Sequence, residues 1–297
     1  LLERCIEDLE AGGPVARLVE AFEGHPLLDA LCQRVIGAVQ GLVLEGKAPG
    51  LARVHPFGGG APAWPDTADA FVAAIDDHLD ELRPRMRRQV QTNEVRRCCG
   101  LLGGFLEVAR ETGLPLRLLE IGSSAGLVMY WDHWRYALGP HRWGDPAAGL
   151  ELACEWEGPP PALDAPVRVA SRRGCDVDPV DATDPASLRF VQSFYWADQP
   201  ERVELLLAAA RALPERPPIE RLGGGDFVER EVAHLPAGVA TVLHHSTMWW
   251  YVPREEQKRI EAAMEAAGAR ATPERPLAWL RSEPPNVDHV EIRLRLW

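Results

Sequence analysis

The densest group of residues with chemical potential lies near the middle of the chain. It is a short segment rich in Gly and Ser, Glu120-Ile121-Gly122-Ser123-Ser124-Ala125-Gly126. Small residues let a backbone turn tightly and approach a ligand, and a following helix would offer unpaired N–H groups. The spacing is not G-x-G-x-x-G, and a P-loop Lys is missing. We expect five of these residues to contact a cofactor, namely Glu120, Gly122, Ser123, Ser124 and Gly126; the alternative is a tight turn without a ligand.

An acidic residue at the end of a second strand often accepts hydrogen bonds from ribose hydroxyls. Asp176 is the expected contact of this kind, although it lies more than twice the usual ~20 residues beyond the turn. An insertion would explain the gap. If residues 150–156 form the second strand, Glu155 would contact the ribose instead of Asp176. The nearby Asp178-Pro179 pair is also typical of a turn that binds no ligand.

Two histidines end the most apolar stretch, residues 239–245. Ligands of open α/β sheets bind outside the carboxyl ends of the strands. Neighbouring residues on a strand face opposite ways, so His244 and His245 are not expected to hold one metal together. We expect His245 to act as a general base; the alternative is a hydrogen-bonded histidine in a pocket wall. The expected substrate pocket includes Ser246, Trp249 and Glu283, with a place in the core as the other interpretation for the tryptophan.

The Gly-rich turn resembles the first motif of Rossmann-type S-adenosylmethionine-dependent methyltransferases, where an acidic residue precedes Gly-rich backbone under the methionine end of the cofactor. Five stretches are also similar to a bacterial family named domain of unknown function 2332: residues 91–94, 119–126, 172–176, 196–199 and the strand that ends at 245–246. The resemblance spans nearly the whole chain. It implies a methyltransferase-like fold with S-adenosylmethionine as the cofactor, and it implies no particular substrate.

The resemblance implies roles for two further pairs of residues. In methyltransferases an acidic residue after the third strand often contacts the adenine amino group beside an apolar neighbour, which assigns Asp226 and Phe227 to the cofactor. Asp226 would otherwise cap a helix, with Glu229 completing a capping box. The segment before the first strand often folds over the cofactor, so we expect Asn93 in the substrate pocket and Glu94 among the catalytic residues, both on a helix. The alternative is a solvated helix face.

Strands alternate with helices after residue 113, which predicts a mostly parallel α/β sheet. The expected strands cover residues 116–122, 219–222, 239–245, 277–281 and 290–294. Short strand-like pieces are expected at 150–156 and 166–171, within an inserted hairpin, and residues 174–179 are expected to end a further strand. The last alternates apolar with charged residues, as an antiparallel edge strand does. Helices are expected over 185–213, with a break near Pro200, and over 254–267, with Gly268 just past the end.

Two regions are predicted. Residues 1–112 form a helical N-terminal region, with helices over 1–46 and 66–112 and a Gly- and Pro-rich loop between them, and we expect it to act as a lid or substrate domain. Residues 113–297 form a Rossmann-like, methyltransferase-type domain with an inserted hairpin near 140–170.

Composition excludes several classes of protein. Of 297 residues 46% are hydrophobic, which is enough for a core, and the net charge of −12 argues against a nucleic-acid partner. No apolar run is long enough to span a membrane, and a signal-peptide pattern is missing. Six scattered cysteines without metal-type spacing fit a reducing cytoplasm. We expect a cytoplasmic protein without a metal or membrane partner; its oligomeric state is left open.

The expected function is S-adenosylmethionine-dependent methyl transfer to a small-molecule acceptor, which needs chiefly positioning and proton removal. Two alternatives stay open. The turn also matches G-x-S-x-G, so Ser124 could be the nucleophile of an α/β-hydrolase-like enzyme, with Asp226 and His245 following in the required order. Against this, about 110 helical residues precede the turn, where a hydrolase would have strands. The other alternative is a non-catalytic protein that binds a nucleotide or S-adenosylmethionine.

Overall fold

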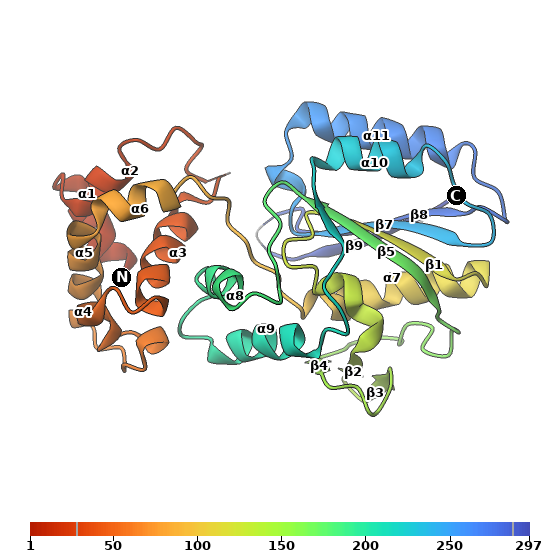
Figure 1. Cartoon of the computed structure of the whole chain (residues 1–297). Helices are drawn as coiled ribbons and strands as arrows, with labels where there is room; N and C mark the ends of the chain where they lie inside the picture. Colours follow the sequence, from red (N-terminus) through yellow and green to blue (C-terminus); the bar gives the residue numbers. More distant parts are fainter. Residues whose placement is uncertain (28, 287) are drawn as a thin grey trace. The chain divides into compact units, whose positions relative to one another are not determined.

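The computed structural model describes residues 1–27, 29–286 and 288–297, and the chain divides into two compact units (Figure 1). The first unit holds Leu1–Thr92 and Asp184–Glu204. The second holds Asn93–Thr183 and Leu205–Trp297. Each unit is therefore built from two separate stretches of the chain.

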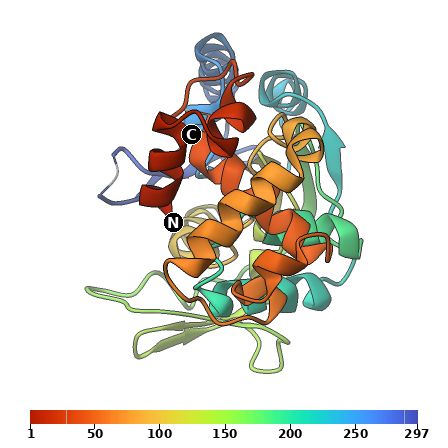
Figure 2. The ribbon, with the colours of Figure 1, turned by 90° about the vertical axis from the view of Figure 1, so that its left-hand side faces the viewer.

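The first unit is helical (Figure 2). Its elements are α1 (Leu2–Glu10), α2 (Pro14–Val19), α3 (Leu31–Leu44), α4 (Pro49–Ala52), a 3₁₀ turn at Pro56–Gly58, α5 (Asp66–Asp77), α6 (Leu79–Arg85), α8 (Pro185–Gln192) and the start of α9 (Pro200–Ala212). Aliphatic side chains such as Val39, Leu42 and Ile75 form its core. Within the described ranges, none of the helices in either unit has the length and apolar character needed to cross a bilayer.

Side-chain hydrogen bonds tie the returning segment 184–204 to α3. The buried amide of Gln40 donates to the carbonyl of Ser193 at 2.7 Å and to that of Tyr195 at 3.0 Å. These carbonyls follow the end of α8, where intrahelical partners run out. The break predicted near Pro200 is confirmed, because α9 begins at that residue.

The second unit contains a six-stranded sheet. Its strands are β1 (Leu116–Ile121), β5 (Val169–Asp176), β6 (Ile219–Arg221), β7 (Ala240–Ser246), β8 (Leu277–Glu283) and β9 (Glu291–Leu296). Their order is β6-β5-β1-β7-β8-β9, with all neighbours parallel except the antiparallel pair β8 and β9. Numbered along the chain, this is the order 3-2-1-4-5-6 of doubly wound α/β folds. The predicted α/β class and the antiparallel edge strand are confirmed.

Helices cover both faces of this sheet (Figure 1). Helix α7 (Arg97–Thr112) packs on one face, and α10 (Gly224–Val232) and α11 (Arg254–Gly268) pack on the other. The central strands are apolar without alternation because both of their faces are buried. Every residue of β7 is buried, which includes both of its histidines.

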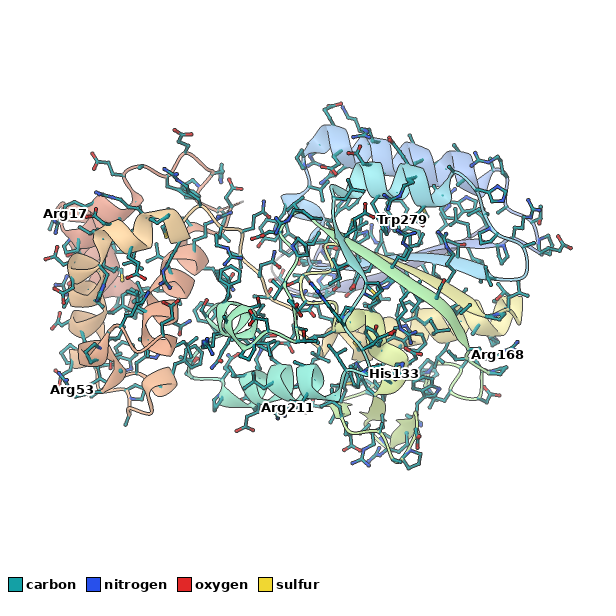
Figure 3. The ribbon with its side chains drawn as sticks, viewed as in Figure 1. Arg17, Arg53, His133, Arg168, Arg211 and Trp279 are labelled. Atoms are coloured by element: carbon teal, nitrogen blue, oxygen red, sulfur yellow. The ribbon has the colours of Figure 1, made fainter. Side chains whose placement is uncertain are left out.

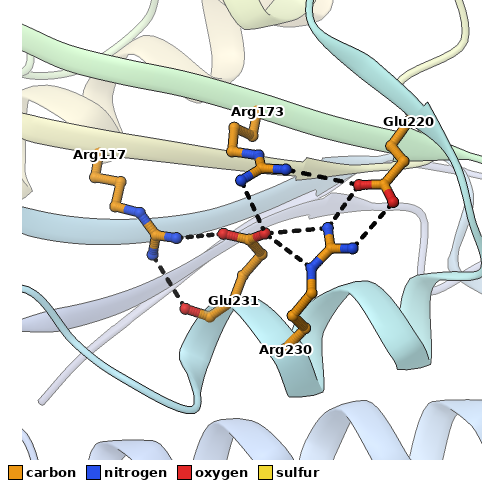
Figure 4. A network of polar contacts seen from close by, with 5 residues as sticks. All are labelled: Arg117, Arg173, Glu220, Arg230 and Glu231. Carbon is orange, nitrogen blue, oxygen red and sulfur yellow. Dashed lines mark hydrogen bonds and ion pairs between the residues drawn. The ribbon is translucent and has the colours of Figure 1, made fainter.

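Ion pairs fasten α10 to the sheet (Figure 4). The buried carboxylate of Glu231 pairs with Arg117 of β1, and Arg173 of β5 lies 3.5 Å from it. Arg230 donates to Glu220 of β6 at 2.6 and 3.0 Å. A buried carboxylate is tolerated when cations surround it in this way.

The inserted segment forms a second, smaller sheet. Its strands are β2 (Arg135–Leu138), β3 (His141–Trp143) and β4 (Glu151–Cys154), in the order β3-β2-β4. Residue Glu155 therefore follows a strand outside the main sheet, whereas Asp176 ends β5 beside β1. The alternative second strand at 150–156 is thus ruled out.

Two local predictions were wrong near the site. Asn93 and Glu94 do not lie on a helix, because residues 86–96 are irregular and α7 begins at Arg97. Asn side chains that bond backbone groups compete with helix formation, and Asn93 does so here. The Gly-rich turn also leads into a short 3₁₀ helix, Val128–His133, interrupted at Tyr130, instead of an α-helix. Most of the side chains in this 3₁₀ helix are bulky and buried, and the chain turns at once into β2.

Gly268 has a different reason to be glycine from the one predicted. It is the last residue of α11 and has no left-handed conformation. A Cβ atom there would lie 2.4 Å from the indole Nε1 of Trp297. The glycine therefore allows the close approach of the chain's last residue.

Candidate functional site

Most of the predicted site residues, but not Asp226 and Phe227, gather where the strand order reverses. From β1 the sheet continues to β5 on one side and to β7 on the other, so the carboxyl ends of β1 and β7 form the topological switch point. Doubly wound folds bind ligands there. Glu120 of β1 pairs in register with His244 of β7, which brings the Gly-rich turn beside the two histidines.

The turn after β1 is conformationally unusual. Gly122 and Gly126 have φ of 66° and 73°, and Ser124 has φ of 53° although it is not glycine. Thr247, just after β7, has φ of 55°. Left-handed non-glycine residues cost free energy and tend to cluster at functional sites. Ser124 follows β1 and Thr247 follows β7, so a left-handed residue lies just beyond each of the two strands that border the switch point.

Two polar side chains hold the turn. The Ser124 N–H donates to Asp176 Oδ2 at 2.9 Å. The Asn93 amide donates to the Ser123 carbonyl at 3.2 Å and accepts from the Leu127 N–H at 2.8 Å. The unpaired N–H groups that the sequence led us to expect are therefore engaged by the protein at Ser124 and Leu127. Asn93 and Asp176 position the turn.

A buried acid and a buried histidine lie side by side under the turn. Glu120 Oε1 is 3.9 Å from His244 Nδ1, and both side chains are almost fully buried. Glu120 Oε2 and both ring nitrogens of His244 have no hydrogen-bond partner among the described residues. The ring of Phe105 from α7 packs edge-on against His244 at 5.1 Å. The pair thus faces α7.

Burial disfavours the charged form of both groups. It raises the pKa of Glu120 well above its usual value, with the Ser123 hydroxyl and the Arg97 guanidinium opposing the shift. Burial, with a smaller contribution from His245, lowers the pKa of His244 to about 3. The imidazole of His244 is therefore neutral at neutral pH, and burial favours the protonated form of the neighbouring Glu120.

His245 faces the opposite side of the sheet, as alternation along a strand predicts. Its Nδ1 lies 2.7 Å from Glu283 Oε1 at the end of β8. The same carboxylate accepts from the Met248 N–H at 3.2 Å and the Trp249 N–H at 3.3 Å. The His245 ring stacks on Trp249 at 5.0 Å and lies 6.0 Å from the ring of Trp279, which is labelled in Figure 3. The Nε2 atom of His245 has no partner in the described part of the chain. Glu283 thereby orients both the imidazole and the turn after β7.

Ser246 ends β7, and Glu94 lies three residues before the start of α7. Arg97 donates to the Ser246 carbonyl at 3.3 Å. The carboxylate of Glu94, which is buried, accepts from the Arg96 N–H at 3.3 Å. Ser246 is thus held by the first residue of α7, and Glu94 by the residue before it.

Asp226 and Phe227 are placed elsewhere. Asp226 is exposed and accepts from Arg259 of α11 at 2.7 Å, and the N-cap of α10 is Gly223, so Asp226 caps nothing. Glu229 also accepts from Arg259, so the capping box is not formed. Phe227 is fully buried in the core beneath α10 and α11. The structure does not bring these two side chains to the turn.

The nucleophile, base and acid expected for a hydrolase are Ser124, His245 and Asp226. The Ser124 hydroxyl and His245 Nε2 are each buried without a hydrogen-bond partner in residues 1–27, 29–286 and 288–297, so they do not bond one another. His245 is oriented by Glu283, and Asp226 is bound to Arg259. A Ser–His–Asp relay is not assembled among these side chains.

Three residues of the site were not predicted. Gly174 of β5 lets Ser123 approach, because a Cβ atom there would lie 2.2 Å from Ser123 Oγ. Met248 lies over Gly122, because a Cβ atom added to Gly122 would lie 2.9 Å from Met248 Cγ. The third, His244, could have been predicted from its position beside His245 at a strand end. The other two depend on contacts between strands, for which a single sequence has no local signal.

The comparison with protein families agrees with the family resemblance over the whole chain. A family model described as "Uncharacterized protein conserved in bacteria (DUF2332)" matches residues 1–297. No curated protein matches the chain.

Proposed function

We propose, starting from the finding that this chain belongs to the DUF2332 family, that it is an S-adenosylmethionine-dependent methyltransferase for a small-molecule acceptor. One observation carries the proposal: the Gly-rich turn after β1 lies at the switch point of a 3-2-1-4-5-6 sheet, braced by Asn93 and Asp176. Such a position suits a nucleoside-type ligand.

The residues present fit this cofactor. Buried polar atoms without partners call for a ligand or water, and Ser124 Oγ is such an atom in the described structure, in the turn itself. Gly122 and Ser123 would lie under the methionine end. Asp176, at the end of β5, would meet the ribose hydroxyls while it holds the Ser124 N–H. When bound, the cofactor supplies an electrophilic methyl group on a sulfonium.

His245 is the proposed proton acceptor. Because Glu283 accepts from Nδ1–H, the lone pair is directed to Nε2, which is the form a general base needs. The ring stacks on Trp249, so we place that indole in the proposed acceptor pocket. Glu94, held beside Arg96, is the second proposed catalytic group.

The proposal is tested by calorimetric titration of the full chain with S-adenosylmethionine and S-adenosylhomocysteine. We expect micromolar binding that Asp176→Asn weakens at least about tenfold, or about 1.4 kcal/mol, because the turn loses its charged acceptor. Glu255→Gln is the matched control, since this exposed acid pairs with Lys258 on α11.

The outcomes separate the three functions. Absence of heat at millimolar ligand contradicts the proposal. Ester hydrolysis that Ser124→Ala abolishes would establish the hydrolase instead. Tight binding with no methyl transfer to any acceptor in a broad set of small nucleophiles would favour the non-catalytic binding protein.

A further inference from the structure

The main sheet of the second unit ends in two edge strands of different character, β6 and β9. Soluble proteins protect such edges, because the unpaired N–H and C=O groups of an edge can pair with another chain. Strand β6 has three residues and follows Pro217-Pro218, so its edge is short and interrupted. Strand β9 has six residues, and neither the strand nor the three residues before it include a proline. The β9 edge lacks these protections.

The hydrogen bonds between β8 and β9 determine which backbone groups of β9 face outward. Leu277 and Trp297 exchange two hydrogen bonds, at 2.9 and 3.4 Å. In an antiparallel ladder, hydrogen-bonded pairs alternate with pairs whose N–H and C=O groups point away from the partner strand. By the register of the two strands, Ile292, Leu294 and Leu296 belong to the second kind. Their N–H and C=O groups therefore point to the open edge, where the described residues provide no further strand.

Apolar side chains line one face of this edge. Ile292 is 42% exposed, and Val290, just before the strand, is 53% exposed. Ile292 lies on the face that α7 covers, since a Cβ atom on Gly100 would lie 3.1 Å from Ile292 Cδ1. The charged residues alternate with the apolar ones and face α11, where Arg295 donates to Glu265 at 2.9 Å. The edge thus presents an exposed apolar row beside outward backbone groups.

The charges of β9 favour one register for pairing with a second copy. A two-fold axis through Ile292 places Glu291 of each copy opposite Arg293 of the other. An axis through any other residue from 291 to 295 places like charges opposite one another. Facing positions of opposite charge stabilise an antiparallel pair, and like charges destabilise it. Arg293 also donates to Glu291 of its own strand at 2.6 Å, so the four side chains would alternate in charge.

We propose that the protein forms a two-fold dimer in which β9 pairs antiparallel with β9 of a second copy, centred on Ile292. This pairing gives partners to the outward N–H and C=O groups and covers the exposed side chains of Ile292 and Val290. The same surface serves both copies, so the assembly closes at two. The inference does not depend on the proposed methyl transfer.

The first test is sedimentation velocity of the full chain from low to high micromolar concentration, where we expect a dimer. Ile292→Pro should be monomeric, because its missing N–H faces the open edge and the ladder with β8 is kept. Ile292→Asp should also be monomeric, because it places two carboxylates at the two-fold axis. Val177→Asp is the matched control, since this exposed aliphatic residue of the same unit lies outside β9.

A charge exchange tests the register. Glu291→Arg and Arg293→Glu should each weaken dimerisation about tenfold, because each places like charges opposite one another at two symmetric positions. The double variant restores opposite charges both within the strand and across the axis, so it should dimerise like the wild type. Circular dichroism and thermal melting confirm that each variant is folded.

Four outcomes would overturn the proposal. They are a wild type that stays monomeric at high micromolar concentration, assemblies larger than two copies, a dimer that both Ile292 variants leave intact, and a Val177→Asp variant that dissociates as they do. A double charge variant no tighter than the single ones would overturn the register centred on Ile292.

Discussion

At the scale of the residue, the neighbours Glu120 and His244 respond to pH in opposite ways. Burial disfavours the charged form of both, which raises the pKa of Glu120 and lowers that of His244. Between pH 6.5 and about pH 3, His244 is protonated in the unfolded state and neutral in the folded state. The contribution of His244 to the free energy of unfolding is therefore present above pH 6.5 and is lost as the pH falls towards 3. For Glu120 the folded state keeps the proton above pH 4.5, so stability falls as the pH rises from there towards the folded-state pKa.

This sign predicts that Glu120→Gln stabilises the protein at neutral and alkaline pH. The amide removes the cost of keeping the carboxyl protonated, which grows by about 1.4 kcal/mol per pH unit between the unfolded pKa of 4.5 and the folded-state pKa. Denaturant unfolding at pH 4, 6 and 8 measures the difference between variant and wild type. A difference that is the same at all three pH values would show that Glu120 does not titrate as proposed.

At the scale of the element, two glycines have opposite roles. Gly174 lies on β5, where a Cβ atom would strike Ser123 of the turn. Gly103 lies within α7, and a Cβ atom there would meet Pro161 at an ordinary 3.4 Å. The first allows strand and turn to meet. The second is an ordinary helical glycine, which is a poor helix former.

We therefore predict that Gly174→Ala and Gly103→Ala change stability in opposite directions. Gly174→Ala should lose roughly 1–3 kcal/mol through overpacking, and Gly103→Ala should gain up to about 1 kcal/mol from helix propensity. Urea unfolding of both variants measures the change. Equal effects would mean that the space around Ser123 relaxes freely.

At the scale of the whole molecule, the first unit needs two parts of the chain. Residues 1–92 contain Gln40, whose acceptors belong to Ser193 and Tyr195 of the returning segment. Without that segment, a buried amide loses both partners, which costs about 1–3 kcal/mol, and apolar surface of α3 is exposed.

We predict that a fragment of residues 1–92 melts without a cooperative transition. A peptide of residues 184–204 added in excess should restore cooperativity, as followed by circular dichroism. A fragment that melts sharply without the peptide would show that the N-terminal helices are an independent domain.

The sequence by itself determined the main features of the sheet unit. Apolar runs such as 239–245 predicted strands buried on both faces, the alternation at 290–294 predicted the antiparallel edge, and the break at Pro200 was correct. These features depend on local periodicity and on backbone chemistry, which a single sequence contains. The Gly-rich turn after β1 was likewise predicted from local composition.

Only the tertiary structure decided which side chains meet. Asn93 reaches the turn from an irregular segment, Asp176 is chosen over Glu155 because β5 pairs with β1, and Glu283 joins His245 across neighbouring strands. The return of residues 184–204 to the N-terminal helices is of the same kind. These contacts join residues far apart in the chain through strand register and packing, and no local pattern specifies either of them.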